Sequence, residues 1–469
     1  MTPIKFGTDG WRAIIAKEFT VENVARVTEA TVQWLKDNTN GTSSVIIGHD
    51  CRFAGEMFAK TAAIVFAKGG VQVKLASGFV STPMVSLGTC KENADLGIVI
   101  TASHNPPAYN GYKIKGSYGG PLLPEKVQEI EDLIPNSSDF KYDEEEFKAL
   151  QAKGLIQDID LEGMYIAAVE ENFDLDAIRN SGLKFAYDAM YGAGQNVIRK
   201  ILPDAVLLHC EDNPGFMGQA PEPIHKNLLE FSDLIKNSGD IAAGLATDGD
   251  ADRIGLYNSK GEFVDSHHII LLLIKYLVEQ KKMTGKVVTA FSASVKVKQL
   301  CDHFGLEHET VKIGFKYICS HMISEDVLLG GEESGGIAIK GHVPERDGIW
   351  MGLVIWEYMA KSGKSLEQLI DEVYAIVGKF AFQRNDLHLT ESVKQSIIER
   401  CKKDEFKSFG SMSVADIQKI DGFKYFFNED EWVMIRPSGT EPVLRTYAEA
   451  ETLQKAEDIL NACKQEILD

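Results

Sequence analysis

Three parts of this chain repeat one order: a β-branched apolar run, a helical stretch and a second apolar run. The three sets lie at 43–49, 55–70 and 71–77, at 183–190, 194–204 and 205–210, and at 286–294, 295–305 and 306–313. This alternation predicts α/β units, because each apolar run is long enough for a strand and each helix can cover a sheet. A fold dominated by helices alone or by antiparallel sheets alone is therefore excluded.

Polar stretches between the three sets predict the domain boundaries. The clearest is the acidic run NSSDFKYDEEE at 136–146, and weaker breaks fall near 258–261 and 383–386. The last segment is shorter and predicts two strands about a loop within 432–450. We therefore expect three similar α/β domains and a smaller C-terminal α+β domain. The predicted domains are 1–145, 146–258, 259–382 and 383–469.

The charge balance excludes several classes of partner. The chain has 49 basic and 69 acidic residues, a net charge of −20, which disfavours nucleic acid and anionic membrane surfaces. Seven cysteines without a CxxC pair indicate reduced thiols. We find no signal-like start and no apolar run long enough for a membrane span. We expect a cytoplasmic protein that is a monomer or a homodimer and binds neither membrane nor nucleic acid.

The first candidate site is the loop TASHNPPAYNGYKI, 101–114, which follows the apolar strand 96–101. Open α/β sheets bind ligands at the C-terminal ends of their strands, where Ser103 would lie. His104 and Asn105 add polar groups, and the two prolines that follow prevent a helix. A serine after a strand is usually structural, but Ser-His-Asn-Pro-Pro followed by Gly-x-Lys is rare, and we predict a functional serine.

The second candidate site is the loop LATDGDADRIG, which follows the apolar strand 241–246. Asp248, Asp250 and Asp252 occupy alternate positions of one turn, and three crowded carboxylates repel one another unless a cation joins them. Their oxygen atoms suit magnesium or another hard ion. An EF-hand is excluded, because Arg253 stands where that loop needs glycine. A solvated acidic turn is the alternative, and the apolar strand before it argues against that reading.

The third candidate site is the loop VLLGGEESGG at 327–336. Glycines on both sides free Glu332, Glu333 and Ser334 from helical structure, and carboxylates beside a hydroxyl suit the vicinal hydroxyls of a sugar. Acidic glycine-rich turns are also common on protein surfaces. By itself this loop favours neither reading.

The fourth candidate site is the loop MIRPSGTEPVLR at 434–445. Arg436 offers a planar fork to a phosphate, and Arg445 follows on the next strand. Between them, Ser438, Gly439 and Thr440 add hydroxyl and backbone donors in a tight turn. The four loops thus offer a nucleophile, ligands for a metal, side chains that can bind sugar hydroxyls and a site for a phosphate group. Together they predict phosphoryl transfer on a phosphorylated sugar.

The four loops, in this order, resemble those of the α-D-phosphohexomutases, the phosphoglucomutase/phosphomannomutase kind. The resemblance runs from FGTDGWR at 6–12 to Arg445 and so covers nearly the whole chain. It implies four domains around a central cleft, with one loop from each. It also implies a phosphorylated Ser103, and Mg²⁺ bound by the three aspartates and a phosphoserine oxygen. The implied reaction interconverts glucose 1-phosphate and glucose 6-phosphate through glucose 1,6-bisphosphate.

The resemblance also implies roles for individual residues. Arg12, Lys113 and Arg253 would supply positive charge, and Lys113 or His104 would handle the proton. Residues expected to bind substrate, in the stretches GEESGG, GHVPERDG, GFKYI and RPSGTEPVLR, are Glu332, Ser334, His342, Arg346, Lys316, Arg436, Ser438, Gly439, Thr440 and Arg445.

One departure from the family bears on the sugar. Some members that use mannose or glucosamine end the third loop in Gly-His, where this chain has Gly335–Gly336. The Glu-Glu-Ser form looks more like glucose-directed members, so glucose is the expected substrate. A phosphomannomutase or a phosphoglucosamine mutase of the same fold is the alternative.

Three other classes remain as competing hypotheses. A metal-dependent phosphatase of the HAD type would use Asp248 as nucleophile, but it needs Thr or Val where Asp252 stands. A dehydrogenase would use Gly192-x-Gly194, but Val197 replaces the third glycine. A silent sugar-phosphate-binding protein would normally have lost Ser103 or an aspartate.

Overall fold

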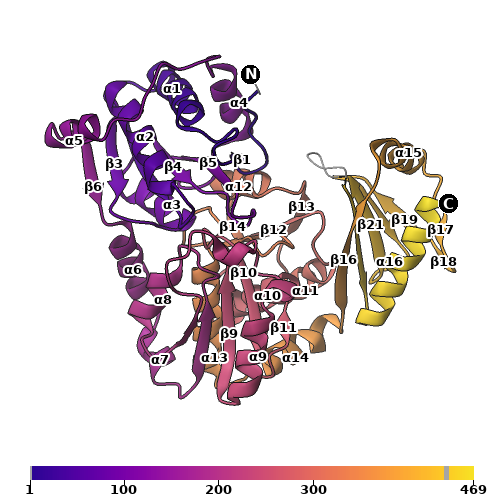
Figure 1. Cartoon of the computed structure of the whole chain (residues 1–469). Helices are drawn as coiled ribbons and strands as arrows, with labels where there is room; N and C mark the ends of the chain where they lie inside the picture. Colours follow the sequence, from indigo (N-terminus) through magenta and orange to yellow (C-terminus); the bar gives the residue numbers. More distant parts are fainter. Residues whose placement is uncertain (1–2, 438–442) are drawn as a thin grey trace.

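The computed structural model describes residues 3–437 and 443–469, which form four units, each built around one main sheet (Figure 1). The sheets of the first three units mix parallel and antiparallel pairs and carry helices. The sheet of the fourth unit is antiparallel throughout. The expected architecture of three α/β units and a smaller C-terminal α+β unit is confirmed.

The first unit has a six-stranded sheet. Its strands are β1 Trp11–Ile14, β2 Ser44–His49, β3 Gln72–Ala76, β4 Leu96–Ile100, β5 Tyr109–Gly116 and β6 Ile156–Ile159, and its helices are α1 Val21–Asn38, α2 Gly55–Lys68, α3 Thr82–Lys91, α4 Pro124–Asp132 and α5 Glu144–Ala152. The strand order is β1-β5-β4-β2-β3-β6. In β2, Val45 and Ile47 enter one core and Ile46 enters another, so the strand is buried on both faces. That double burial is why its sequence is an unbroken apolar run.

The second unit has a five-stranded sheet in the order β11-β10-β9-β7-β8. Its strands are β7 Lys184–Asp188, β8 Val206–Leu208, β9 Ile241–Thr247, β10 Ile254–Asn258 and β11 Phe263–Val264, and its helices are α6 Leu161–Asn172, α7 Leu175–Arg179, α8 Gln195–Ile201 and α9 Leu229–Ser238. Two short 3-10 turns, Phe216–Gly218 and His225–Asn227, lie between β8 and α9.

The third unit has a four-stranded sheet in the order β13-β12-β14-β15. Its strands are β12 Lys286–Ala290, β13 His308–Val311, β14 Val327–Gly331 and β15 Ile337–Ile339, and its helices are α10 Ser266–Glu279, α11 Lys296–Phe304, α12 Phe315–Ser324, α13 Gly348–Ser362 and α14 Leu366–Val377. Helix α10 contains the apolar run 269–277, which is buried in the protein core. Among the described residues, no helix is long and apolar enough to cross a membrane.

The fourth unit has a five-stranded sheet in the order β16-β22-β21-β20-β19. Its strands are β16 Ala381–His388, β17 Ser408–Phe409, β18 Met412–Ser413, β19 Asp416–Gln418, β20 Phe423–Phe426, β21 Trp432–Pro437 and β22 Val443–Ala450, and its helices are α15 Glu391–Lys402 and α16 Leu453–Leu468. The strands β17 and β18 form a separate two-stranded ribbon.

Strands of the sheets run through or beyond the polar stretches on which the predicted domain boundaries depend. Strand β6 pairs with β3 and extends the first sheet to Ile159, beyond the expected boundary at 145. The break at 258–261 is the turn between β10 and β11, so the second sheet continues to Val264. Strand β16 passes through the third break, 383–386. Polar composition marks surface turns, and a turn within a hairpin has the same composition as a turn between domains.

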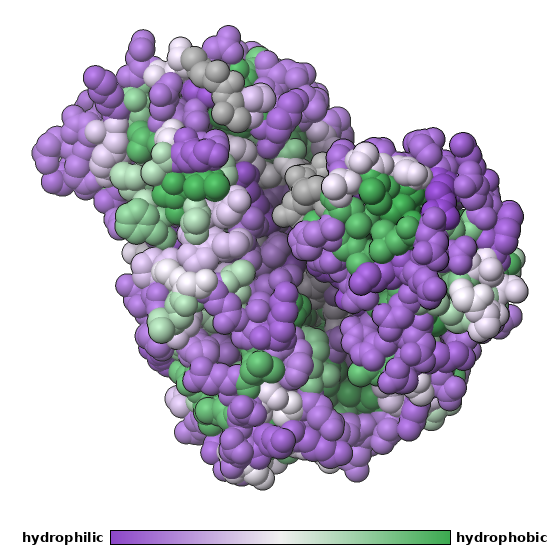
Figure 2. Space-filling model, turned by 45° about the vertical axis from the view of Figure 1, so that its right-hand side comes forward, coloured by the Kyte–Doolittle hydropathy of each residue, from purple (hydrophilic) through white to green (hydrophobic). Residues whose placement is uncertain are grey.

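The first three units share one large apolar core, whereas the fourth has its own. The shared core joins residues such as Ile46, Leu245 and Trp356 from the three units. The fourth unit packs most of its apolar side chains between its sheet and its helices. It meets the third unit through a small cluster in which Phe291 contacts Trp432 and its neighbours. Figure 1 accordingly shows the fourth unit standing to one side, and Figure 2 shows a hollow with mostly hydrophilic walls between it and the first unit.

Candidate functional site

Each predicted loop joins two antiparallel strands of a different unit. The four strand pairs are β4 and β5, β9 and β10, β14 and β15, and β21 and β22. The described parts of the first three loops meet, as the following contacts show.

Ser103 lies just beyond the end of β4 in a strained conformation. Its φ is 50°, in the left-handed region that residues other than glycine seldom adopt, and its side chain is buried. Its N–H donates to Thr101 Oγ1 at 2.9 Å, and its Oγ donates to Asp248 Oδ2 at 2.5 Å. Such strain persists only where surrounding contacts hold it, and it concentrates at functional sites.

The three aspartates of the second loop converge in the interior. Asp248, Asp250 and Asp252 are fully buried, and one oxygen of each lies within 4.8 Å of the others. Gly249 allows this loop to reach the serine loop, because a Cβ there would lie 2.6 Å from Ser103 O. The two loops are therefore packed directly against each other.

These aspartates fit a hard divalent cation. Carboxylate oxygens are the ligands that Mg²⁺ prefers. Among the described atoms, Oδ1 of Asp250 and Oδ1 of Asp252 are buried without a hydrogen-bond partner. Burial and the charges of the other two aspartates raise the pKa of Asp248 well above its usual value. A bound cation would relieve both the repulsion and the unpaired oxygens.

Cations from two units already approach the aspartates. Lys113 Nζ lies 2.8 Å from Asp250 Oδ2, 3.0 Å from Asp252 Oδ2 and 2.7 Å from Asp9 Oδ2. Arg346 Nη2 lies 2.7 Å from Asp252 Oδ2 and 2.6 Å from Asp9 Oδ2. Burial alone would raise the pKa of Asp250, but Lys113 outweighs it and holds the pKa below its usual value. The first three units are thus tied together by charge at this point.

His104 and Arg12 border the serine. His104 Nδ1 lies 3.3 Å from Ser103 Oγ, and Arg12 Nη1 donates to Asn105 Oδ1 at 2.6 Å. Burial, with Arg253 and Arg12 nearby, holds the pKa of His104 well below its usual value. A ring nitrogen of His104 thus faces the serine, and its surroundings disfavour the protonated form.

The third loop is fixed to its surroundings by Glu332. Its Oε1 accepts a hydrogen bond from Gly314 N at 2.9 Å, and burial raises the pKa of Glu332 to about 7. Gly336 bridges to Arg253 of the second unit. A Cβ at Gly336 would lie 2.4 Å from Arg346 Cδ, so the arginine fills the space a side chain would need. Ser334 is half-buried on the same turn.

The fourth loop begins and ends with arginines placed side by side. Arg436 and Arg445 are direct partners across β21 and β22. Like charges directly opposite each other destabilise a sheet, so this pair favours an anion between the two side chains. Arg436 Nη2 lies 3.2 Å from Asp421 Oδ2. The predicted residues Ser438, Gly439 and Thr440 lie outside the described residues.

Comparison with known proteins agrees with this arrangement. Four models described as phosphoglucomutase/phosphomannomutase match the chain: α/β/α domain I at 3–141, domain II at 163–261, domain III at 265–377 and the C-terminal domain at 397–465.

The chain belongs to the phosphoglucomutase/phosphomannomutase family.

Three relatives illustrate the range of this family. A phosphoglucosamine mutase from Methanococcus maripaludis is 31% identical over 88% of this chain and 90% of its own length. A phosphoglucomutase/phosphomannomutase from Thermococcus kodakarensis is 29% identical over 97% and 96%. A crystal structure from Thermus thermophilus, described as a phosphomannomutase, is 30% identical, covers 100% of both chains and has a TM-score of 0.87. All three chains match along nearly their full lengths.

Three more of the predicted residues, His342, Arg346 and Lys316, lie in different environments. His342 is buried: its Nε2 lies 2.9 Å from Asp347 Oδ2, and its ring stacks on Trp350 at 3.8 Å. Arg346 forms ion pairs with Asp252 and Asp9. Lys316 lines a cavity of about 170 Å³ beside Asp9. We leave His342 out of the proposed sugar site, because Trp350 covers one face of its ring and Nε2 is paired with Asp347.

The sequence interpretation missed two charged residues of this site. Asp9 receives contacts from Lys113 and Arg346, although FGTDGWR served there only as a landmark of the family. Arg52, in the sequence HDCR after β2, contacts the serine loop. Arg52 could have been found from the sequence, because Asp50-x-Arg52 directly follows an apolar strand and so places two charged residues at the end of the sheet.

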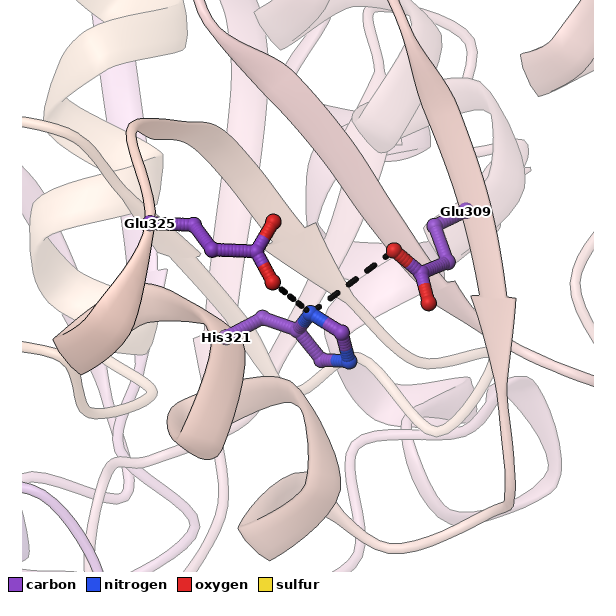
Figure 3. A group of neighbouring side chains, drawn as sticks. All are labelled: Glu309, His321 and Glu325. Carbon is purple, nitrogen blue, oxygen red and sulfur yellow. Dashed lines mark hydrogen bonds and ion pairs between the residues drawn. The ribbon is translucent and has the colours of Figure 1, made fainter.

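A second group of possible metal ligands lies in the third unit. Glu309 on β13 and His321 and Glu325 at the end of α12 face one another (Figure 3). His321 Nδ1 lies 2.8 Å from Glu325 Oε1 and 3.7 Å from Glu309 Oε2. Lys286 Nζ lies 2.9 Å from Glu309 Oε2 and 2.6 Å from Glu325 Oε2. This half-exposed group already has its balancing cation, so we interpret it as an ion-pair cluster.

Proposed function

We propose that this chain is a phosphohexomutase whose Ser103 carries the phosphoryl group between the C1 and C6 oxygens of a hexose. The 2.5 Å hydrogen bond from Ser103 Oγ to Asp248 Oδ2 carries this proposal. It places a strained, buried hydroxyl against a carboxylate cluster that fits a divalent cation. Nucleophile and cation site can therefore act on one phosphoryl group.

The proposed reaction has two halves. In the first, the phosphorus–oxygen bond to Ser103 breaks and a new one forms to the free hydroxyl of a hexose monophosphate, which loses its proton. In the second, the other phosphate of the resulting 1,6-bisphosphate returns to Ser103, and the sugar oxygen regains a proton. Mg²⁺ held by Asp248, Asp250 and Asp252 would neutralise charge on the phosphoryl oxygens. Glucose 1,6-bisphosphate, or its amino-sugar counterpart, would phosphorylate an unmodified Ser103.

Residues around the serine suit the remaining tasks. His104 Nδ1, 3.3 Å from Ser103 Oγ, is within reach of the proton that moves. Lys113, Arg12 and Arg253 would stabilise developing negative charge without rearrangement, because other side chains already fix Lys113 and Arg12. Residues proposed to bind the sugar and its second phosphate are Glu332, Ser334, Lys316, Arg436 and Arg445.

The proposed sugar is glucosamine, with glucose as the second candidate. The names of the relatives support the amino sugar, and so favour the alternative expectation over glucose. The glucose candidate rests on the third loop, which has the Glu-Glu-Ser form and ends in Gly335–Gly336 rather than Gly-His. Mannose remains the third sugar to compare, because other relatives carry that name.

The test is a set of coupled assays on the 1-phosphates of glucosamine, glucose and mannose. Each contains Mg²⁺ and a trace of the matching 1,6-bisphosphate, and each runs beside Ser103→Ala. We expect turnover by the wild type that needs both additions, and none by the folded variant. Near-normal turnover by Ser103→Ala would overturn the mechanism, and the ratio of the three rates ranks the sugars.

A further inference from the structure

Arg52 occupies an unusual position behind the active serine. It follows β2 by three residues and is 3% exposed, so it faces protein rather than the cleft. Each of its terminal nitrogens donates two hydrogen bonds, and all four acceptors are backbone carbonyls of one loop. The acceptors are Ser103 O at 2.6 Å, Asn105 O at 2.6 Å, Pro106 O at 2.9 Å and Tyr109 O at 3.0 Å.

The third nitrogen of the Arg52 guanidinium faces a carboxylate. Nε forms an ion pair with Asp50 Oδ2 at 3.2 Å, and Asp50 Oδ2 in turn accepts a 2.5 Å hydrogen bond from Thr101 Oγ1. Thr101 Oγ1 accepts from Ser103 N. Ser103 is therefore held at both backbone groups: Arg52 donates to its carbonyl, and Thr101, which is linked to Arg52 through Asp50, accepts from its N–H.

This arrangement requires a planar guanidinium. Within the serine loop, Asn105 N donates to Ala102 O and Tyr109 N donates to Pro106 O. Arg52 supplies the donor for Ser103 O and Asn105 O, which would lose it without the guanidinium. Lysine offers three donors from one nitrogen and cannot reproduce two parallel forks. Burying a charge is costly unless it is paired, and here the carbonyls and the Asp50 carboxylate surround the guanidinium.

The second unit closes over the other face of the same guanidinium. The Phe216 ring centroid lies 5.0 Å from Arg52 Cζ, and Phe216 is buried. Phe216, Met217 and Gly218 all have positive φ values, of 47°, 52° and 81°. Two strained residues in a row imply that the contact is maintained against a local cost. The unit that supplies the aspartates therefore also holds Arg52.

We propose that Arg52 is a positioning residue: it holds Ser103 Oγ in line with the aspartate cluster by fixing the carbonyls of 103–109. The inference rests on the proposed function, since phosphoryl transfer is what this placement serves. Arg52 itself touches neither the substrate nor the transferred group. Loss of the clamp lets the serine loop move while the aspartates stay in place.

The experiment compares Arg52→Lys with Arg26→Lys. Arg26 is a matched control, because it is 6% exposed, lies in the same unit and donates to Pro135 O at 2.7 Å. Two measurements are made on the full chain: kcat and KM of the mutase reaction, and amide hydrogen exchange of 102–111 without substrate. We expect Arg52→Lys to lose about 100-fold in kcat, the scale of a displacement of about 1 Å, with KM little changed. Exchange in 102–111 should become faster, and Arg26→Lys should show neither effect.

The outcomes separate this inference from the proposed function. The positioning role of Arg52 would be overturned if Arg52→Lys kept wild-type kcat and wild-type exchange of 102–111. It would also be overturned if Arg26→Lys lost as much kcat as Arg52→Lys. If the wild type turned over no hexose phosphate, the proposed function would fail, and exchange would still test the clamp. If Arg52→Lys did not fold, Phe216→Leu would replace it, since that change keeps every donor of Arg52. For Phe216→Leu we expect faster exchange of 102–111 and a loss of kcat of less than about 100-fold. Wild-type exchange together with wild-type kcat in this variant would overturn the inference.

Discussion

Replacing Arg436 with alanine should weaken substrate binding without unfolding the fourth unit. A hydrogen bond to a charged group contributes about 1.5–3 kcal/mol, which corresponds to about 10- to 140-fold in affinity for a hexose phosphate. The substitution also removes a like charge directly opposite Arg445 and a partly exposed ion pair with Asp421. These two effects oppose each other and each is small, so the free energy of unfolding should change by less than about 1 kcal/mol.

The assay pairs titration calorimetry of a hexose 6-phosphate with urea unfolding of the free protein. Arg400→Ala is the control, because Arg400 lies in the same unit, packs on Phe406 and donates to the carbonyls of Ile467 and Glu466. We expect the control to lose stability and keep affinity, the reverse of Arg436→Ala. Unchanged affinity in Arg436→Ala, or an equal loss in the control, would refute the assignment of a phosphate clamp to β21 and β22.

Three further predictions concern the metal site, the packing of the two loops and the response to acid. Chelation of divalent cations should abolish turnover and added Mg²⁺ should restore it, whereas Asp248→Asn should stay inactive at any Mg²⁺ concentration in the same assay. Gly249→Ala should lower kcat by about 100-fold, because its Cβ would lie 2.6 Å from Ser103 O. Steady-state kinetics beside a melting curve will separate this effect from unfolding. Burial lowers the pKa of His267 from 6.5 to about 4 in the folded state. The folded state therefore loses stability as pH falls from 6.5 towards 4, by about 2 kcal/mol between pH 7 and pH 5, and urea unfolding of His267→Gln should lack that part of the loss.

The sequence predicts well which site residues lie at the ends of strands. Ser103 and Asp248 each follow a buried apolar strand, and apolar runs of that kind can be recognised in the sequence. Their meeting across units does not follow from the strand ends alone, because the two strands belong to different sheets, and it is expected only from the family resemblance. The two strands predicted within 432–450 are present as β21 and β22, and they pair antiparallel.

The contacts that it does not predict depend on residues far apart in the chain. Arg346 pairs with Asp9, and 337 positions separate them, so no local pattern reveals the pair. His342 is buried by Trp350 on α13 and by an aspartate that Tyr165 of the second unit also binds. A motif can show that a histidine lies near a site, but only the packing of neighbouring units decides whether its ring is free.

The unequal sharing of the apolar core has a consequence for how the molecule responds to heat. Because the first three units bury side chains in one continuous core, the melting of each is coupled to that of the others, although the first unit also packs a second core of its own. The fourth unit has a separate core and meets the third through a small aromatic cluster and a few polar contacts, such as Lys424 Nζ with Phe291 O and Ala293 O, so its melting is less strongly coupled to theirs. A calorimetric scan should therefore resolve two transitions. A ligand whose phosphate is held by Arg436 and whose phosphoryl acceptor lies at Ser103 would merge them into one.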